Sequence, residues 1–212
     1  MMSTHTPVQA HMHFAEAASE RRDFAAIARW IAPRAKVLDL GCGDGALLGY
    51  LRDTLNVRGY GVERADANVL ACVQNGVNVI QMDLEAGLSG FEAQSFEVVI
   101  LSQTLQAMHN TEGIVLDMLR VGKEVIVTFP NFGYWKHRIQ LIGGNMPVSR
   151  NLPYQWYDTP NVHLCTISDF DNFCRDHNIR VTERLVLTDG KPVSVLPNIL
   201  GSLAMYRLGN GA

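Results

Sequence analysis

Short apolar runs alternate along the chain with stretches whose apolar residues recur every three or four positions. Almost unbroken apolar runs such as FEVVIL predict strands that helices cover on both faces of a sheet. The predicted strands are 37–40, Arg58–Glu63, Val77–Met82, Phe96–Leu101, Glu124–Phe129, Arg180–Leu187 and Leu203–Leu208. The three-to-four spacing predicts the helices Phe14–Ile31, Ala46–Asp53, Ala67–Asn75, one starting at Asn110 or Thr111 and ending near Gly122, Tyr134–Ile142 and Ser168–His177.

Residues typical of helix ends support several of these boundaries. Asp66 is the predicted N-cap of helix 67–75, and Gly76 is its predicted stop. Thr166 and Asp169 have the spacing of a capping box at the start of helix 168–177. These signals place each helix between two strands.

Strands that alternate with helices predict a parallel sheet with right-handed crossovers. We expect the last predicted strand, Leu203–Leu208, to run antiparallel to Arg180–Leu187. The predicted fold is therefore α/β, with a doubly wound, seven-stranded, mostly parallel sheet whose last strand is antiparallel.

Two parts of the chain depart from this rhythm. Residues 1–13 are polar, carry three histidines and are expected to form a flexible tail, which leaves 14–212 as one domain. Residues 132–165 are too long for a simple connection and contain Tyr154, Trp156 and Tyr157. This insertion is either a functional lid or docking surface, or a loop whose aromatic side chains pack onto the domain.

Composition narrows the class of protein. Of 212 residues, 47% are apolar, and the net charge of −3 gives no electrostatic footprint for nucleic acid or membrane. We expect neither a transmembrane helix nor a signal peptide, and a cytoplasmic location. The four cysteines, Cys42, Cys72, Cys165 and Cys174, form no C-x-x-C pair and are expected to be reduced thiols. No metal-ligand spacing appears.

The stretch 37–45, VLDLGCGDG, combines a buried strand, a glycine-rich turn and the start of a helix. Its glycines follow the pattern G-x-G-x-G, whereas the dinucleotide-binding fingerprint is G-x-G-x-x-G. Acidic residues follow at the ends of successive predicted strands: Asp39, Glu63 and Asp83. In a doubly wound sheet, an acid at the end of the second strand binds ribose hydroxyls. The three acids and the loop predict one nucleoside pocket.

This pattern resembles motif I of the class I S-adenosylmethionine (SAM) methyltransferases, a Rossmann-like family whose seventh strand is antiparallel. The resemblance implies that SAM or S-adenosylhomocysteine binds here. Asp39, Gly41 and Gly43 would surround the methionine moiety, and Glu63 would hold the ribose. The implied cofactor-binding set is Asp39, Gly41, Cys42, Gly43, Glu63, Arg64, Met82, Asp83, Leu84, Ser102 and Gln103.

A more specific resemblance extends from Arg22 to Val186. It is carried by VLDLGCGDG (37–45), GVERADANVLACVQNGVNVIQMDLEAGL (61–88), ILSQTLQAM (100–108), MLRVGKEVIVTFPNFGYWKHR (118–138), MPVSRNLPYQWYDTPNVH (146–163) and CTISDF (165–170). These segments resemble the MetW family of methionine biosynthesis proteins. The resemblance implies a partner, the homoserine O-acyltransferase MetX, whose reaction this chain would support.

The residues leave other functions open. An active methyltransferase on a small molecule is one alternative, with the insertion as its acceptor lid; a fold that serves only as a binding scaffold is another. Candidate bases are His109 and His163, while Asp158 and Tyr154 could face an acceptor or a partner. No nucleophile elbow is present, so the chain does not resemble an acyltransferase catalyst itself. No catalytic residue is assigned.

Overall fold

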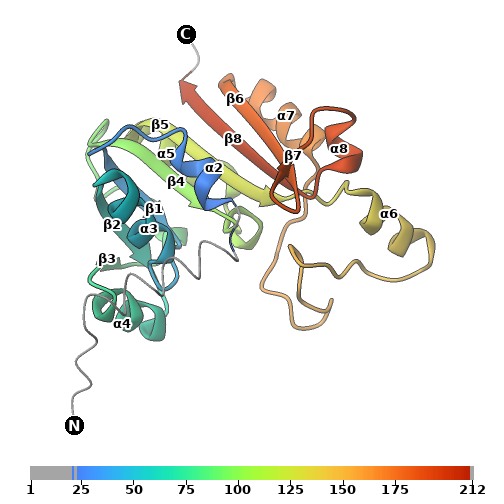
Figure 1. The fold of residues 1–212 in the computed structure, drawn as a ribbon, viewed down its shortest axis with the longest axis horizontal. Helices are drawn as coiled ribbons and strands as arrows, with labels where there is room; N and C mark the ends of the chain where they lie inside the picture. Colours follow the sequence, from blue (N-terminus) through green and yellow to red (C-terminus); the bar gives the residue numbers. More distant parts are fainter. Residues whose placement is uncertain (1–20, 22, 211–212) are drawn as a thin grey trace.

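The computed structural model describes residue 21 and residues 23–210, which form an eight-stranded sheet in the order β3-β2-β1-β4-β5-β8-β6-β7 (Figure 1). The strands are β1 (Lys36–Leu40), β2 (Arg58–Glu63), β3 (Asn78–Gln81), β4 (Phe96–Ser102), β5 (Gly122–Pro130), β6 (Ile179–Thr188), β7 (Lys191–Pro192) and β8 (Leu203–Asn210). Strands β1 to β5 pair in parallel, and β8 lies antiparallel between β5 and β6.

This topology confirms the predicted fold class, with one strand more than predicted. The additional strand is β7, a two-residue edge strand that pairs Lys191 with Thr188 and Pro192 with Leu187 across a turn. A strand of two residues is too short to show the apolar alternation from which a strand is predicted. Its proline is tolerated because the strand lies at the sheet edge.

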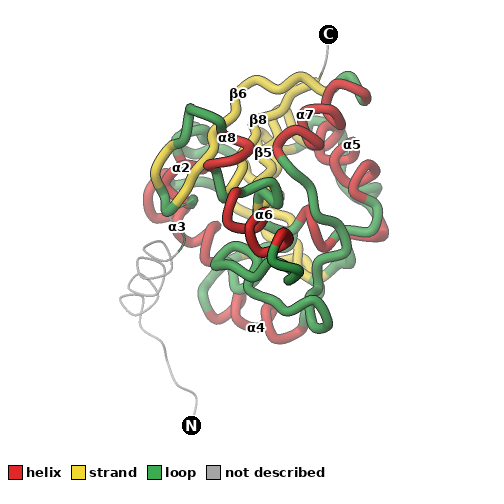
Figure 2. Tube along the Cα trace, turned by 90° about the vertical axis from the view of Figure 1, so that its right-hand side faces the viewer, coloured by secondary structure: helices red, strands yellow, loops and turns green. Residues whose placement is uncertain are grey.

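Helices cover both faces of the sheet, as Figure 2 shows. The α-helices are α2 (Phe24–Ala28), α3 (Ala46–Leu55), α4 (Asp66–Gln74), α5 (Thr111–Val121), α6 (Trp135–Ile142), α7 (Ile167–Asp176) and α8 (Pro197–Leu200), with 3₁₀ turns η1 (Leu84–Ala86) and η2 (Leu105–Ala107). Alternate residues of β4 enter different cores. Val98 and Ile100 pack in the core that contains α2 and α3, whereas Val99 and Leu101 join the core that contains α5 and α7.

The predicted N-caps of α5 and α7 are confirmed, and that of α4 is wrong. Asn110 caps α5, and Thr166 with Asp169 forms the capping box of α7. Asp66, however, is the first residue of α4 and not its N-cap, which is Ala65. Its carboxylate instead accepts a hydrogen bond of 2.6 Å from Gln81 at the end of β3. A sequence pattern cannot detect this competing partner.

The N-terminal predictions are tested only in part. Helix α2 ends at Ala28, and a turn follows before Pro33, so the predicted helix to Ile31 is too long at this end. The predicted tail 1–13 and the first part of that helix lie outside the described residues. In the described part of the chain, no helix reaches the length and hydrophobicity that a bilayer span requires.

The 132–165 insertion leaves the sheet at the end of β5 and projects away from it (Figure 1). It begins with α6 and continues as an extended loop that returns to α7. The Phe132 N–H donates to the carbonyl of Cys165 at 3.0 Å, so the two ends of the insertion meet.

Candidate functional site

The strand order reverses between β1 and β4, and in open α/β sheets this is where ligands bind. The glycine-rich turn of 41–45 lies at this position, between β1 and α3. Gly41, Gly43 and Gly45 have φ angles of 68°, 58° and 81°, which side chains rarely tolerate. A Cβ on Gly41 would lie 2.8 Å from the Thr104 methyl group, while nothing lies within 4 Å of one on Gly43. Gly43 therefore leaves open space in front of the turn.

Glu63 joins the end of β2 to this turn. Its Oε2 accepts a hydrogen bond of 3.0 Å from the Gly43 N–H, and its Oε1 accepts from the N–H groups of Arg64 and Ala65 at 2.8 and 2.9 Å. These three donors fix the carboxylate at the carboxyl edge of the sheet. A carboxylate has about four acceptor sites, so it can still accept from a ligand hydroxyl.

Asp39 is a buried carboxyl group, only 2% exposed, near the end of β1. Its Oδ1 is buried, and no donor among the described residues reaches it. Burial raises the pKa of Asp39 to about 7; the Arg21 guanidinium opposes this shift and the Glu63 carboxylate adds to it. A buried acceptor without a donor is costly for a folded chain, and it marks a position where a ligand donor would be satisfied.

The third acid, Asp83, follows β3. Its Oδ1 accepts from the Glu85 N–H at 3.0 Å and its Oδ2 lies 3.3 Å from Arg64 Nη1. The hydrogen bond from Glu85, followed by the contact with Arg64, lowers the pKa of Asp83. Met82 and Leu84 flank Asp83 and pack against the core. The structure therefore brings the three predicted acids to one edge of three adjacent strands.

Cys42 lies behind the glycine turn. Its sulfur is 3.7 Å from that of Cys72 on α4, and Cys72 donates to the Gly43 carbonyl at 3.1 Å. A Cβ on Gly61 would overlap the Cys42 sulfur, so a small side chain and a glycine fit each other here. Burial raises the pKa of both thiols. They support the turn from behind and are poor nucleophiles.

At the end of β4, the structure adds residues that sequence reasoning missed. Arg21 forms a two-pronged ion pair with buried Asp23 at 3.0 and 2.9 Å and donates to Ser102 Oγ at 2.9 Å. Gln103, with a φ of 53°, donates to the same Asp23 at 3.1 Å. Arg21 and Asp23 precede a short helix and belong to no motif, so no sequence signal identifies them.

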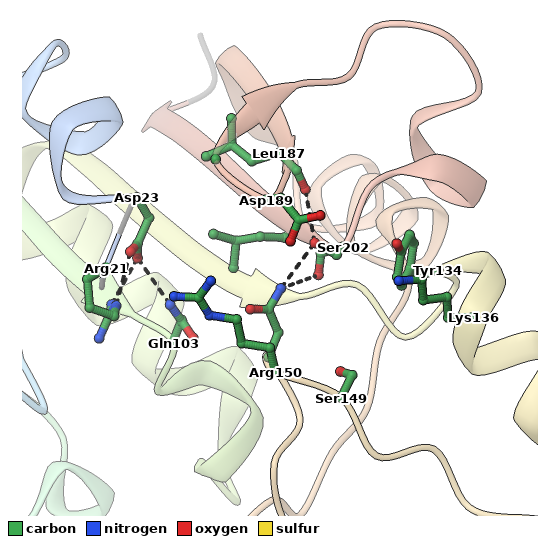
Figure 3. A pocket seen from close by; sticks show the side chains of 13 residues that line it. Arg21, Asp23, Gln103, Tyr134, Lys136, Ser149, Arg150, Leu187, Asp189 and Ser202 are labelled. Atoms are coloured by element: carbon green, nitrogen blue, oxygen red, sulfur yellow. Dashed lines mark hydrogen bonds and ion pairs between the residues drawn. The ribbon is translucent and has the colours of Figure 1, made fainter. Parts of the chain in front are cut away.

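A cavity of about 190 Å³ opens beside this cluster (Figure 3). Its lining combines polar and apolar residues from the segment before α2, the end of β4, the insertion, the β6–β7 turn and the start of β8: Arg21, Asp23, Gln103, Tyr134, Lys136, Ser149, Arg150, Asn151, Leu187, Asp189, Gly190, Ser202 and Leu203. Of the predicted cofactor-binding residues, only Gln103 lines it. The cavity is thus a neighbour of the predicted SAM pocket and not that pocket itself.

The two candidate bases lie away from this cavity. His109 and His163 are both exposed, and the His163 ring contacts the His109 carbonyl at 3.3 Å where the insertion meets η2. Neither of them lines the cavity. Tyr154 and Asp158 are also exposed, on the outer part of the insertion.

Comparison with known proteins shows the family to which this chain belongs. Residues 21–208 match the family profile described as "Methionine biosynthesis protein MetW". The chain belongs to the MetW family. Nearly all of the described residues fall within this match, including the glycine turn, the three acids and the insertion.

One curated relative joins the MetW family to a second function. The bifunctional methionine biosynthesis protein MetXA/MetW of Rhodopirellula baltica is 36% identical to this chain over 173 residues, or 77% of the chain. The chain spans only 28% of that relative's length.

Solved structures agree on the fold at low sequence identity. A SAM-dependent methyltransferase from Archaeoglobus fulgidus is 15% identical with a TM-score of 0.65, over 92% of this chain and 98% of that one. One from Thermotoga maritima is 14% identical with a TM-score of 0.64, over 90% and 88% of the two chains. The MetW-family chain therefore has the class I methyltransferase fold.

Proposed function

We propose that this chain binds SAM or S-adenosylhomocysteine at the edge of β1, β2 and β3 and supports a homoserine O-acyltransferase in methionine biosynthesis. The observation that carries the proposal is the relative in which a MetW region shares one polypeptide with MetXA. Joining two domains raises their effective concentration to the millimolar range, which is useful when they act together. A separate MetW-family chain would achieve the same association through a binding surface.

The residues at the edge of the sheet fit the proposed ligand. Asp39 offers a buried acceptor that no donor among the described residues reaches, Gly43 leaves open space, and Glu63 is fixed beside it. Met82 and Leu84 supply apolar surface next to Asp83. A ligand with a hydroxyl pair, an aromatic base and a charged amino-acid end matches this set of donors, acceptors and apolar contacts.

Each residue then has a defined role. Glu63 accepts hydrogen bonds from the ribose hydroxyls, and its three backbone donors keep it oriented. Met82 and Leu84 flank the adenine, with Asp83 at its edge. Asp39, balanced by Arg21, faces the amino-acid end, and Ser102 and Gln103 close the floor of the pocket. When bound, SAM would supply an activated methyl group, but the proposed role requires only its binding.

The proposal also includes regulation, in which the bound SAM ligand controls the effect of this chain on its acyltransferase partner. SAM is made from methionine, so a SAM pocket on an accessory subunit suits feedback control of the pathway. The decisive experiment is an acyl-transfer assay of the homoserine O-acyltransferase from the same organism, with and without this chain and with added SAM. We expect binding and a rise in rate that SAM modulates. If this chain does not bind the acyltransferase and does not change its rate, the proposal is refuted.

The cavity beside Gln103 favours a second candidate function, methyl transfer to a small polar molecule. It lies next to the proposed SAM pocket, and its lining offers both cationic and acidic groups. Conversion of SAM to S-adenosylhomocysteine that depends on an added acceptor would establish this activity. SAM binding without such turnover, across a panel of metabolites, would favour the accessory role.

A further inference from the structure

Exposed apolar side chains gather on the insertion. Among the described residues, twenty large apolar side chains are exposed, and ten of them fall in the thirty residues 135–164. We call these ten the insertion patch: Trp135, Ile139, Leu141, Ile142, Met146, Tyr154, Trp156, Tyr157, Val162 and Leu164. Single exposed apolar residues are ordinary on protein surfaces, but a concentration of this kind marks an interaction site.

The backbone beneath the patch is held by buried polar contacts. The His137 ring, fully buried on α6, contacts Ser149 Oγ at 2.9 Å. Gln140 bonds both the N–H and the carbonyl of Val148, at 3.0 and 3.2 Å. The N–H groups of Val162 and His163 both donate to the Gln106 carbonyl, at 2.8 and 3.0 Å. The insertion is therefore anchored on α6, on its own loop and on η2, while Tyr154, Trp156 and Tyr157 remain exposed.

A second exposed segment extends this surface. Val195, Leu196, Ile199 and Leu200, before and within α8, are also exposed. Asn131, at the start of the insertion, donates to the carbonyls of Asn198 and Gly201 at 3.1 and 2.7 Å, which keeps the two segments adjacent. Figure 1 shows α8 beside the base of α6.

Charge distinguishes the insertion from the rest of the chain. Residues 132–165 carry Lys136, Arg138 and Arg150 against one acid, Asp158, whereas the whole chain has a net charge of −3. No acidic side chain in the described part of the chain forms an ion pair with Lys136 or Arg138. A partner surface that combines apolar and acidic side chains would therefore complement the insertion.

We propose that the insertion patch is the surface on which the homoserine O-acyltransferase docks, an inference that rests on the proposed function. The fused relative supplies the occupant, because its MetW region is tethered to a MetXA region. Trp and Tyr dominate binding energy in protein interfaces, and Trp156 and Tyr157 meet edge to face at 5.7 Å. Tyr134, Lys136, Ser149 and Arg150 of the same insertion line the cavity beside the proposed ligand pocket. Partner docking and ligand binding thus share one structural element.

The test compares two variants that each remove exposed apolar side chains. The patch variant carries Ile142→Ser, Trp156→Ser and Tyr157→Ser, at positions that are 87%, 71% and 70% exposed. The control variant carries Leu70→Ser and Val73→Ser on α4, 58% and 63% exposed, away from α6 (Figure 1). Circular dichroism and SAM calorimetry verify that both variants fold and keep the ligand pocket. The affinity of each chain for the purified acyltransferase is then measured by interferometry at two salt concentrations.

We expect the patch variant to lose at least ~100-fold in affinity and the control variant to match the unchanged chain. Higher salt should weaken the complex of the unchanged chain, because salt screens the proposed attraction between Lys136 or Arg138 and acidic side chains of the partner. If the unchanged chain binds and the patch variant binds equally well, the docking surface is wrong while the proposed function stands. If the unchanged chain does not bind, both proposals fail. Sedimentation measures whether the chain associates with itself. If the unchanged chain and the control variant self-associate and the patch variant does not, the patch binds a second copy of the chain instead.

Discussion

Two regions of this molecule, the ligand end at the edge of β1 to β3 and the insertion end, depart in opposite ways from the usual pattern of buried apolar and exposed polar side chains. At the edge of β1 to β3, the chain buries a carboxyl group, Asp39, whose Oδ1 meets no donor among the described residues. On the insertion, it exposes Trp156, Tyr157 and eight other large apolar side chains. Buried polar groups and exposed apolar patches are the informative exceptions in a folded protein.

The difference indicates what each end binds. A small ligand that carries donors and hydroxyls would satisfy the acids of the first end, while its glycine turn leaves room for close approach. A flat apolar surface with aromatic side chains suits a macromolecule, which can cover a large area at once. The buried Asp39 carboxyl group lowers the stability of the free chain, and a small ligand would offset that loss. The exposed apolar side chains lower the solubility of the free chain, and a macromolecular partner would cover them.

The largest effect is expected from Asp39→Asn, which removes the buried charge. The pKa of Asp39 in the folded chain is about 7, raised by burial from 3.8. The folded state thus holds the proton more tightly than the unfolded state, so stability falls as pH rises between these values. The shift corresponds to about 4 kcal/mol, fully developed above pH 7.

Thermal unfolding checks this prediction. Asp39→Asn should raise the Tm by roughly 10 °C at pH 8 and change it little at pH 4, for a domain of this size. The same variant should bind SAM more weakly at pH 8. Asp158→Asn, on the exposed insertion, serves as a control with no expected shift. Equal Tm gains for Asp39→Asn at both pH values would show that ionisation of Asp39 is not the cause.

Glu63→Ala should break the ligand end and leave the insertion intact. Hydrogen bonds to a charged group contribute about 1.5–3 kcal/mol each, so loss of two should weaken SAM binding at least ~100-fold. Calorimetry measures the affinity, and Glu92→Ala, an exposed loop acid, is the matched control. Affinity for the acyltransferase in the absence of SAM should not change. SAM binding that survives in Glu63→Ala would remove Glu63 from the pocket.

Ser149→Ala should loosen the insertion and spare the ligand end. It leaves the buried His137 ring without its 2.9 Å partner, at a cost of about 1–2 kcal/mol. We expect faster proteolysis within 145–162 and a several-fold loss of partner affinity, with SAM affinity unchanged. Ser89→Ala, at an exposed position, controls for the substitution itself. Unchanged proteolysis would mean that the other anchors hold the loop alone.

Tyr134→Phe should have the smallest effect on stability and separates the two candidate functions. Tyr134 is buried, and its side chain lines the cavity (Figure 3). Removing the Tyr134 hydroxyl should change the free energy of unfolding by less than about 0.5 kcal/mol. If the chain methylates a small acceptor held in the cavity, KM for that acceptor should rise in turnover assays. An accessory role leaves acyl-transfer stimulation unchanged in this variant.

Much of the fold could be predicted from local pattern. FEVVIL forms β4, as expected for an almost unbroken apolar run covered on both faces of a sheet, and Thr166 caps α7 because its partner lies three residues away. Predictions were wrong where a distant residue competes. Asp66 bonds Gln81 instead of capping α4, and β7 is too short to leave a pattern.

The sequence by itself determined the order of the strands along the chain, the glycine turn and the acids at the ends of β1, β2 and β3, because these depend on neighbours in the chain. Only the tertiary structure placed Arg21 and Asp23 beside Ser102 and Gln103, since this contact joins residues about 80 positions apart. The structure also decided that Tyr154, Trp156 and Tyr157 of the insertion are exposed while Tyr134 is buried. Burial depends on what the rest of the fold leaves uncovered, and no local pattern of residues encodes that.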